Sequence, residues 1–277
     1  FFVFFLGLLK SENKGCLVIN SGGFPGARIN RAFYLAALLF YKKSSIIWVS
    51  HGFASKKPFY INKQTNFLTH SKANFNRLSN LGYINIENFP SHFPVHNSPF
   101  LAGEFNYDIV MIGYLEKRKG HLQFLNDFYK QILKYDLKVA IIGGGPEFDE
   151  LNNFILQSEC GKNISLLGFR EDYLDILLAS KVLVHPSVGS EDMPLIVIEA
   201  LGLGCIVASS QVAGLGEYLL DGYNAHVLTH DTNLEQIVYM DSDARQQLSK
   251  NALKTYNDFF SRESYMNNWI NLLNKCK

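Results

Sequence analysis

Two glutamates, Glu191 and Glu199, are separated by seven residues at a point where a loop leads into a helix. Pro194 precedes the apolar run of this helix, where a missing N–H costs little. The free N–H groups and positive dipole end of a helix start favour phosphate. Glu199 can accept hydrogen bonds from vicinal hydroxyls, and Glu191 can reach what the phosphate carries. This combination indicates a nucleotide-sugar pocket.

The alternative interpretation is that both glutamates are solvated charges on an ordinary strand–loop–helix unit. The flanking residues favour the pocket. Residues 185–228 resemble the donor-binding signature of retaining glycosyltransferases with the GT-B fold and a Glu-x7-Glu motif, that is, glycosyltransferase family 4 or "glycosyl transferases group 1". The signature elements occur in the family's order, as Pro186-Ser187, Glu191, Pro194, Glu199-Ala200, Gly204, Gly216-Glu217 and Asp221-Gly222-Tyr223-Asn224.

The resemblance implies roles for the two glutamates and for the residues at the helix start. Glu191 is the expected catalytic residue that faces the donor sugar, and Glu199 the residue that binds the ribose hydroxyls. The donor phosphates are expected at the helix start, on the backbone of Met193, Pro194 and Leu195.

The turn after the predicted strand 108–112 carries basic residues. In the family this turn has an Arg after its glycine and a Lys before a second glycine, and both contact the donor diphosphate. Lys119 matches the second element and is an expected catalytic and donor-binding residue. Tyr114 stands where the Arg is expected and offers one hydrogen bond, without the charge or bidentate fork of a guanidinium. Lys117 or Arg118 could compensate, although a solvated helix entrance is the alternative interpretation of this basic run.

Three further segments supply candidate site residues. The glycines of IIGGGPEFDEL lack a full Gly-x-Gly-x-x-Gly, but the family's loop passes close to the nucleotide, which makes Gly144 a candidate. In LLGFRED the resemblance implies that Phe169 or Arg170 stacks on the nucleobase, with a surface position as the alternative for Arg170. His51 follows a strand at the carboxyl edge of a parallel sheet, where the family has a residue facing the donor sugar. A purely structural histidine is the alternative there.

The composition is that of a globular protein, with 47% hydrophobic and 18% charged residues among 277. A net charge of +1 argues against bulk electrostatic binding to nucleic acid. The four cysteines are scattered without metal-ligand spacing, which predicts free thiols and a cytoplasmic location. Asp241-Ser242-Asp243 has the Asp-x-Asp form of a metal site in the other glycosyltransferase fold. We interpret it as a helix cap and expect neither a metal nor a cofactor.

Short β-branched runs alternate with longer helical patterns, which predicts an α/β protein with parallel sheets. The resemblance implies the GT-B architecture, with two Rossmann-like domains facing across a cleft. Residues 1–103 would form an acceptor-side domain, residues 104–260 the donor-binding domain, and residues 261–277 a helix crossing back to the first. Strands are predicted near residues 16–20, 46–50, 66–69 and 84–87, then near 108–112, 138–142, 164–167, 182–185, 206–209 and 225–228. In the second domain helices are predicted near residues 120–134, 147–160, 173–179, 195–203 and 214–220.

The first domain has four predicted strands, fewer than the six of a full Rossmann-like domain. We therefore expect an N-terminally truncated domain rather than a naturally reduced one. The apolar start FFVFFLGLLK is shorter than the roughly 20 residues that span a bilayer and lacks the features of a signal peptide. This segment could form either a buried helix or strand or part of a membrane-facing surface.

The resemblance implies a metal-independent, retaining transferase that moves a sugar from a UDP- or GDP-linked donor to a glycan or lipid-linked acceptor. Its expected setting is bacterial surface polysaccharide synthesis, such as lipopolysaccharide or capsule, with peripheral contact to the inner face of the membrane through the first domain. The main alternative is a catalytically silent nucleotide-sugar-binding or scaffold subunit, which Tyr114 and the thin first domain favour. A GT-B epimerase or phosphorylase is a third, less favoured hypothesis.

Overall fold

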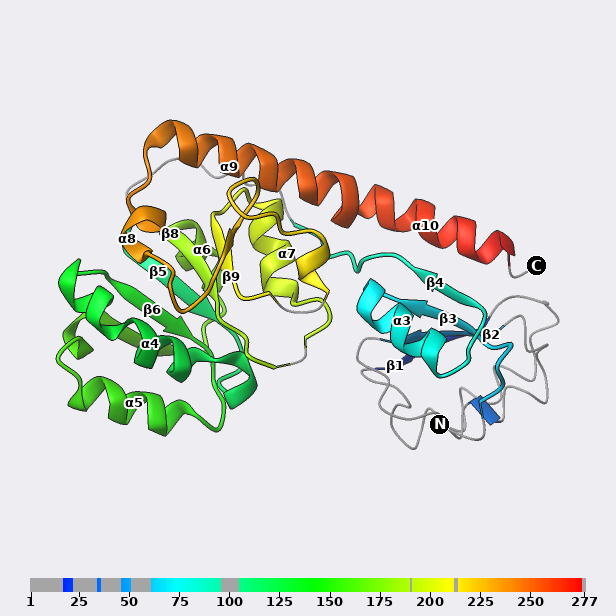
Figure 1. Cartoon of the computed structure of the whole chain (residues 1–277), viewed down its shortest axis with the longest axis horizontal. Coiled ribbons are helices and arrows are strands. Elements are labelled where there is room, and N and C mark those ends of the chain that lie inside the picture. Colours follow the sequence, from blue (N-terminus) through cyan, green and yellow to red (C-terminus); the bar gives the residue numbers. More distant parts are fainter. Residues whose placement is uncertain are drawn as a thin grey trace. The chain divides into compact units, whose positions relative to one another are not determined.

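The computed structural model describes residues 17–21, 34–35, 46–50, 61–95, 105–189, 191–211 and 214–275 (Figure 1). The chain divides into two compact units, which are Phe1–Ser91 with Glu263–Lys277, and His92–Arg262. The C-terminal segment thus groups with the first unit. In the described ranges, every helix falls short of the length and apolarity needed to cross a bilayer.

The first unit is built on a parallel sheet. Neighbouring residues of a strand face opposite sides, so Trp48 and Val49 contribute to two different cores. Trp48 packs with Leu78 of a helix on one face, and Val49 packs with Leu272 of another helix on the other face. Among the described residues of this unit, the strands, in spatial order, are β1 (Leu17–Ser21), β2 (Ile46–Ser50), β3 (Asn66–Thr69) and β4 (Ile86–Asn88). The described residues also include helices α3 (Lys72–Asn80) and α10 (Arg262–Lys275).

The second unit has a six-stranded parallel sheet in the order β10-β9-β8-β5-β6-β7. The first strand of the unit, β5, lies in the middle, and the chain builds the sheet outward on one side and then on the other. The order therefore reverses between β5 and β8, which is the ligand-binding position of doubly wound sheets. The strands are β5 (Tyr107–Ile112), β6 (Val139–Ile142), β7 (Ile164–Gly168), β8 (Ser180–His185), β9 (Val207–Ser209) and β10 (His226–Val227).

Helices cover both faces of this second sheet (Figure 1). Met111 and Phe124 belong to the core on the face covered by α4 and α5, whereas Val110 and Leu201 belong to the core under α7. The helices of the unit are α4 (His121–Lys134), α5 (Phe148–Gln157), α6 (Tyr173–Leu178), α7 (Leu195–Gly202), α8 (Leu234–Val238) and α9 (Ser242–Thr255).

Helices α3 and α9 each begin with a side-chain cap. Ser71 Oγ accepts a hydrogen bond from the Asn74 N–H at 3.1 Å and begins α3. Asp241 Oδ1 accepts one from the Ala244 N–H at 2.9 Å and begins α9. The Asp-Ser-Asp sequence therefore starts a helix, as predicted.

The helix predicted over residues 214–220 is wrong, because only a single 3₁₀ turn, η4 (Leu215–Glu217), is formed. Asn224 provides the physical reason. Its side-chain oxygen accepts from the Leu220 N–H at 2.8 Å, and its Nδ2 donates to the Tyr218 carbonyl at 2.8 Å. These side-chain bonds compete with the backbone bonds of a continuing helix.

Candidate functional site

A pocket of about 750 Å³ lies in the second unit, lined by loops that follow β5, β6, β7 and β8. It therefore lies where the strand order reverses, as expected for a ligand site in this sheet type. His51 lies outside the described residues. The other predicted site residues all line this pocket, and they are Tyr114, Lys119, Gly144, Phe169, Arg170, Glu191, Met193, Pro194, Leu195 and Glu199.

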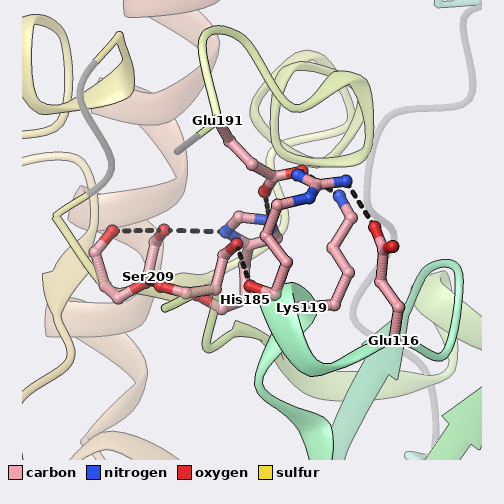
Figure 2. Close-up of polar contacts among 8 residues, drawn as sticks. Glu116, Lys119, His185, Glu191 and Ser209 are labelled. Atoms are coloured by element: carbon pink, nitrogen blue, oxygen red, sulfur yellow. Dashed lines mark hydrogen bonds and ion pairs between the residues drawn. The ribbon is translucent and has the colours of Figure 1, made fainter. Parts of the chain in front are cut away.

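Glu191 is at the centre of a charged cluster (Figure 2). Its Oε1 pairs with the Lys119 ammonium and lies 2.9 Å from Arg118 Nη1. Its Oε2 lies 2.8 Å from His185 Nε2. Two basic side chains and one histidine thus surround a single carboxylate whose side chain is 8% exposed.

The cluster determines the charge of Glu191. Burial by itself would raise the pKa of this carboxyl, but His185 and Lys119 hold the pKa well below its usual range. Glu191 is therefore ionised at neutral pH and has no proton to give. The geometry suits it to hold cations and accept hydrogen bonds, and does not suit it to act as a general acid.

His185 is fixed from both sides. It ends β8 beside Ser209, which ends β9 in the paired register. Ser209 Oγ lies 3.2 Å from His185 Nδ1, while the Glu191 carboxylate occupies the other ring nitrogen. The imidazole is buried, and these two contacts define its orientation.

The loops that carry Lys119 and Glu191 fit closely against each other. The Arg118 carbonyl accepts hydrogen bonds from the N–H groups of Val188 and Gly189 at 2.9 and 3.2 Å. A Cβ on Gly189 would lie 2.0 Å from Arg118 Cγ. Gly120 has a φ of +73°, and a Cβ there would lie 2.1 Å from the Pro186 carbonyl oxygen. Only glycine at both positions permits this approach.

Glu199 has different surroundings. It is 5% exposed, and its Oε1 accepts a hydrogen bond from the Tyr173 hydroxyl at 2.8 Å. Among the described residues it has no basic partner. Burial raises the pKa of Glu199, an effect that the Tyr173 hydroxyl partly opposes. Burial and the same hydrogen bond raise the pKa of Tyr173 to about 12, so the phenol keeps its proton.

The loop after β7 contributes Phe169 and Arg170 to the lining of the pocket. Phe169 is 80% exposed and lines the pocket. Arg170 is engaged by Asp172, with Nε and Nη2 at 2.7 and 2.5 Å from the two carboxylate oxygens. Phe169 is thus the ring that is available for stacking, while Arg170 has a partner within its own loop.

Two residues that were not predicted as site residues, His185 and Tyr173, each contact one of the two glutamates. His185 stands within the recognised motif and Tyr173 begins a predicted helix, but neither position signals a contact with a glutamate. His121, the first residue of α4, was not predicted either and is 2% exposed. Burial, assisted by the charges of His185 and Lys119, lowers the pKa of His121 to about 4, so this histidine adds no charge to the cluster at neutral pH.

Known proteins resemble this chain, and a family profile covers most of the second unit. A family profile described as "Glycosyl transferases group 1" matches residues 99–255, more than half of the chain. An uncharacterized glycosyltransferase of Methanocaldococcus jannaschii is 29% identical over 124 residues, which are 44% of this chain and 33% of that protein. The UDP-Gal:alpha-D-GlcNAc-diphosphoundecaprenol alpha-1,3-galactosyltransferase of Escherichia coli is 35% identical over 111 residues, 38% of this chain and 28% of that one. The chain spans about a third or less of the length of these two relatives.

Among solved structures, HepE of Anabaena in complex with UDP matches with a TM-score of 0.75 at 16% identity, covering 93% of this chain and 78% of that one. At this identity the likeness concerns the fold, and it confirms the predicted α/β, GT-B fold class. The region matched by the family profile includes every residue that lines the pocket. The chain therefore belongs to the glycosyl transferases of group 1.

Proposed function

We propose that this chain transfers a sugar, with retention of anomeric configuration, from a UDP- or GDP-linked donor to a glycan or lipid-linked acceptor. One observation carries the proposal. A single pocket holds two glutamates in opposite environments, Glu191 among basic side chains and Glu199 against a neutral hydroxyl. A donor that joins a diphosphate to a ribose diol needs this combination of groups.

The proposed binding mode follows from these environments. The diphosphate lies near Lys119 and Arg118, at the start of α7 where Pro194 and Leu195 line the pocket. The ribose hydroxyls donate to Glu199, and the base stacks on Phe169. His51 stays a candidate for the sugar side.

In the proposed reaction the bond between the anomeric carbon and the phosphate oxygen breaks. The acceptor oxygen forms its bond to that carbon on the same face, and its proton passes to the departing phosphate. Lys119 and the backbone at Leu195 stabilise the charge that develops on the leaving group, and Glu191 orients the sugar. No step calls for a protein nucleophile or a metal.

The setting is inferred from the relatives. The name of the Escherichia coli relative specifies a UDP-linked donor and a diphosphoundecaprenol acceptor. This supports a lipid-linked acceptor and a role in bacterial surface polysaccharide synthesis at the cytoplasmic face of the membrane.

A catalytically silent nucleotide-sugar-binding subunit is the second candidate function, because Tyr114 replaces an expected arginine. Arg118 argues for activity, since its guanidinium already lies 2.9 Å from Glu191 in the charged cluster. Transfer rather than nucleotide binding alone distinguishes the two candidates.

The test uses the 277-residue chain with UDP- and GDP-linked sugars and a diphosphoundecaprenol-linked sugar acceptor. We expect transfer from at least one donor, with a product anomer that ¹H NMR finds unchanged from the donor's. An inverted product would reject the retaining mechanism. Nucleotide binding without turnover for every donor would favour the silent subunit.

A further inference from the structure

We propose that Tyr173 is a specificity-determining residue that makes the pocket select ribonucleotides over 2′-deoxyribonucleotides by fixing the Glu199 carboxylate. This inference rests on the proposed nucleotide site. It assigns a new role to a residue for which neither the motif nor the family resemblance predicts one.

The geometry that carries it is a single hydrogen bond inside the pocket. The Tyr173 hydroxyl donates to Glu199 Oε1 at 2.8 Å, and both residues line the pocket. The two lie 26 positions apart, at the beginning of α6 and within α7. The phenol thereby locks one carboxylate oxygen and leaves Oε2 to accept from a ligand.

The surroundings of Glu199 define what that ligand group must be. The apolar residues Ile112, Ile142 and Ile196 line the same pocket as Glu199. A buried carboxylate in such surroundings gains most from hydrogen-bond donors. A neutral hydroxyl supplies a donor without placing another charge in the pocket, and the 2′-hydroxyl distinguishes a ribonucleotide from its deoxy analogue.

The chemistry of the phenol strengthens the assignment. Tyr173 gives its one proton to Glu199 and cannot also donate to the ligand. As a hydrogen-bond donor, the hydroxyl therefore acts on the ligand through the carboxylate, which makes Tyr173 a positioning residue. Without the hydroxyl, Glu199 would lose its fixed orientation as well as a hydrogen bond.

Tyr173 also lies close in sequence to the proposed base-stacking residue. Phe169 and Tyr173 belong to one short segment after β7, and Arg170 and Asp172 within it pair with each other. This internal pair restrains the loop between the two aromatic residues. The segment thus links recognition of the base to recognition of the ribose.

Calorimetric titration with UDP and 2′-deoxy-UDP, and with the corresponding guanosine pair, tests the inference. We expect the wild-type chain to prefer the ribonucleotide of one pair by about tenfold. Tyr173→Phe should weaken that ribonucleotide by about threefold to tenfold, leave the deoxynucleotide within about twofold, and so largely remove the preference. Tyr173→Leu, which also lacks the hydroxyl, should remove the preference too. Tyr239→Phe deletes an exposed phenol outside the pocket and should change neither affinity.

A double-mutant cycle with Glu199→Gln completes the test. In the Glu199→Gln variant, the added change Tyr173→Phe should have little further effect on the preference for the ribonucleotide. Equal weakening of both nucleotides by Tyr173→Phe would overturn the inference, as would a wild-type chain that binds both nucleotides of a pair equally well. A wild-type chain that binds neither UDP nor GDP would instead reject both the proposed function and this inference.

Discussion

His185 Nε2 lies 2.8 Å from Glu191 Oε2, and both side chains are more than nine-tenths buried. His185 ends β8, so the last residue of a central strand holds the carboxylate that the next loop presents to the pocket. The orientation of Glu191 is thereby tied to the sheet rather than left to a surface loop.

His185→Ala should lower transfer several-fold more than it lowers nucleoside diphosphate affinity, because it releases Glu191 Oε2 without touching the proposed phosphate contacts. The unfolding free energy should fall by about 1–3 kcal/mol for the lost buried interactions. Urea denaturation and steady-state kinetics measure the two effects. His230→Ala, at a histidine whose side chain is 82% exposed, is the control. Unchanged transfer in the His185 variant would show that the contact is only structural.

The two glutamates should respond oppositely to replacement by glutamine. The pKa of Glu191 is depressed, so its contribution to stability is present above the reference pKa of 4.5 and is lost as pH falls toward the folded-state pKa. Glu191→Gln should therefore destabilise the chain at pH 7, by about 2 kcal/mol for a buried carboxylate whose basic partners are partly exposed.

The pKa of Glu199 is raised, so its ionisation opposes folding increasingly as pH rises through the folded-state pKa. Glu199→Gln should accordingly stabilise the chain at pH 7, by about 1 kcal/mol, and reduce the pH dependence of unfolding above pH 4.5. Thermal melts of both variants between pH 4 and pH 8 give the comparison. Destabilisation of equal size in the two would contradict the difference in environment.

Replacement of Glu199, and not of Glu191, should weaken nucleotide binding. Glu199→Ala should weaken nucleoside diphosphate binding by about 1–3 kcal/mol, the value of a hydrogen bond to a charged group. Glu191→Ala should not weaken it, since the change frees Lys119 for phosphate, yet it should cut transfer. Titration calorimetry and a transfer assay on each variant supply the data. Equal loss of affinity in both would mean that the role assigned to Glu191 is wrong.

Arg118→Ala should weaken donor diphosphate binding and transfer about tenfold, if this guanidinium supplies the charge that Tyr114 does not. Lys117→Ala is the matched control, because it removes a neighbouring positive charge that does not contact Glu191. The control should have an effect of less than about twofold, as expected for a surface charge. Similar losses in both variants would point to general electrostatics instead.

Transfer should survive chelation of divalent cations. Asp241 of the Asp-Ser-Asp sequence caps α9 and accepts from the Ala244 N–H at 2.9 Å, which gives it a structural role. Full activity in excess EDTA is the expected result in a donor assay. Loss of turnover with EDTA and recovery with Mn²⁺ or Mg²⁺ would overturn the metal-independent mechanism.

Local patterns were sufficient to predict much of the fold. The strands β2 and β3 have the predicted bounds, and β5, β6 and β8 lie within one or two residues of them, because β-branched runs between turn residues are read from the sequence directly. The segment 214–220 could not be predicted in this way. The side chain of Asn224, which bonds the backbone of this segment, is itself held by Thr255 Oγ1 at 2.8 Å. That contact spans 31 positions of the chain.

The sequence by itself identified the residues that could bind a donor, since motif order and spacing are local properties. Their partners were decided only by the tertiary structure. Lys119 reaches Glu191 across 72 positions because β5 and β8 are adjacent parallel strands whose carboxyl ends meet at one edge. Glu191 and Glu199 are chemically the same residue, and burial favours a raised pKa in both. His185 and Lys119 hold the pKa of Glu191 well below its usual range, whereas the Tyr173 hydroxyl only partly opposes the rise in the pKa of Glu199.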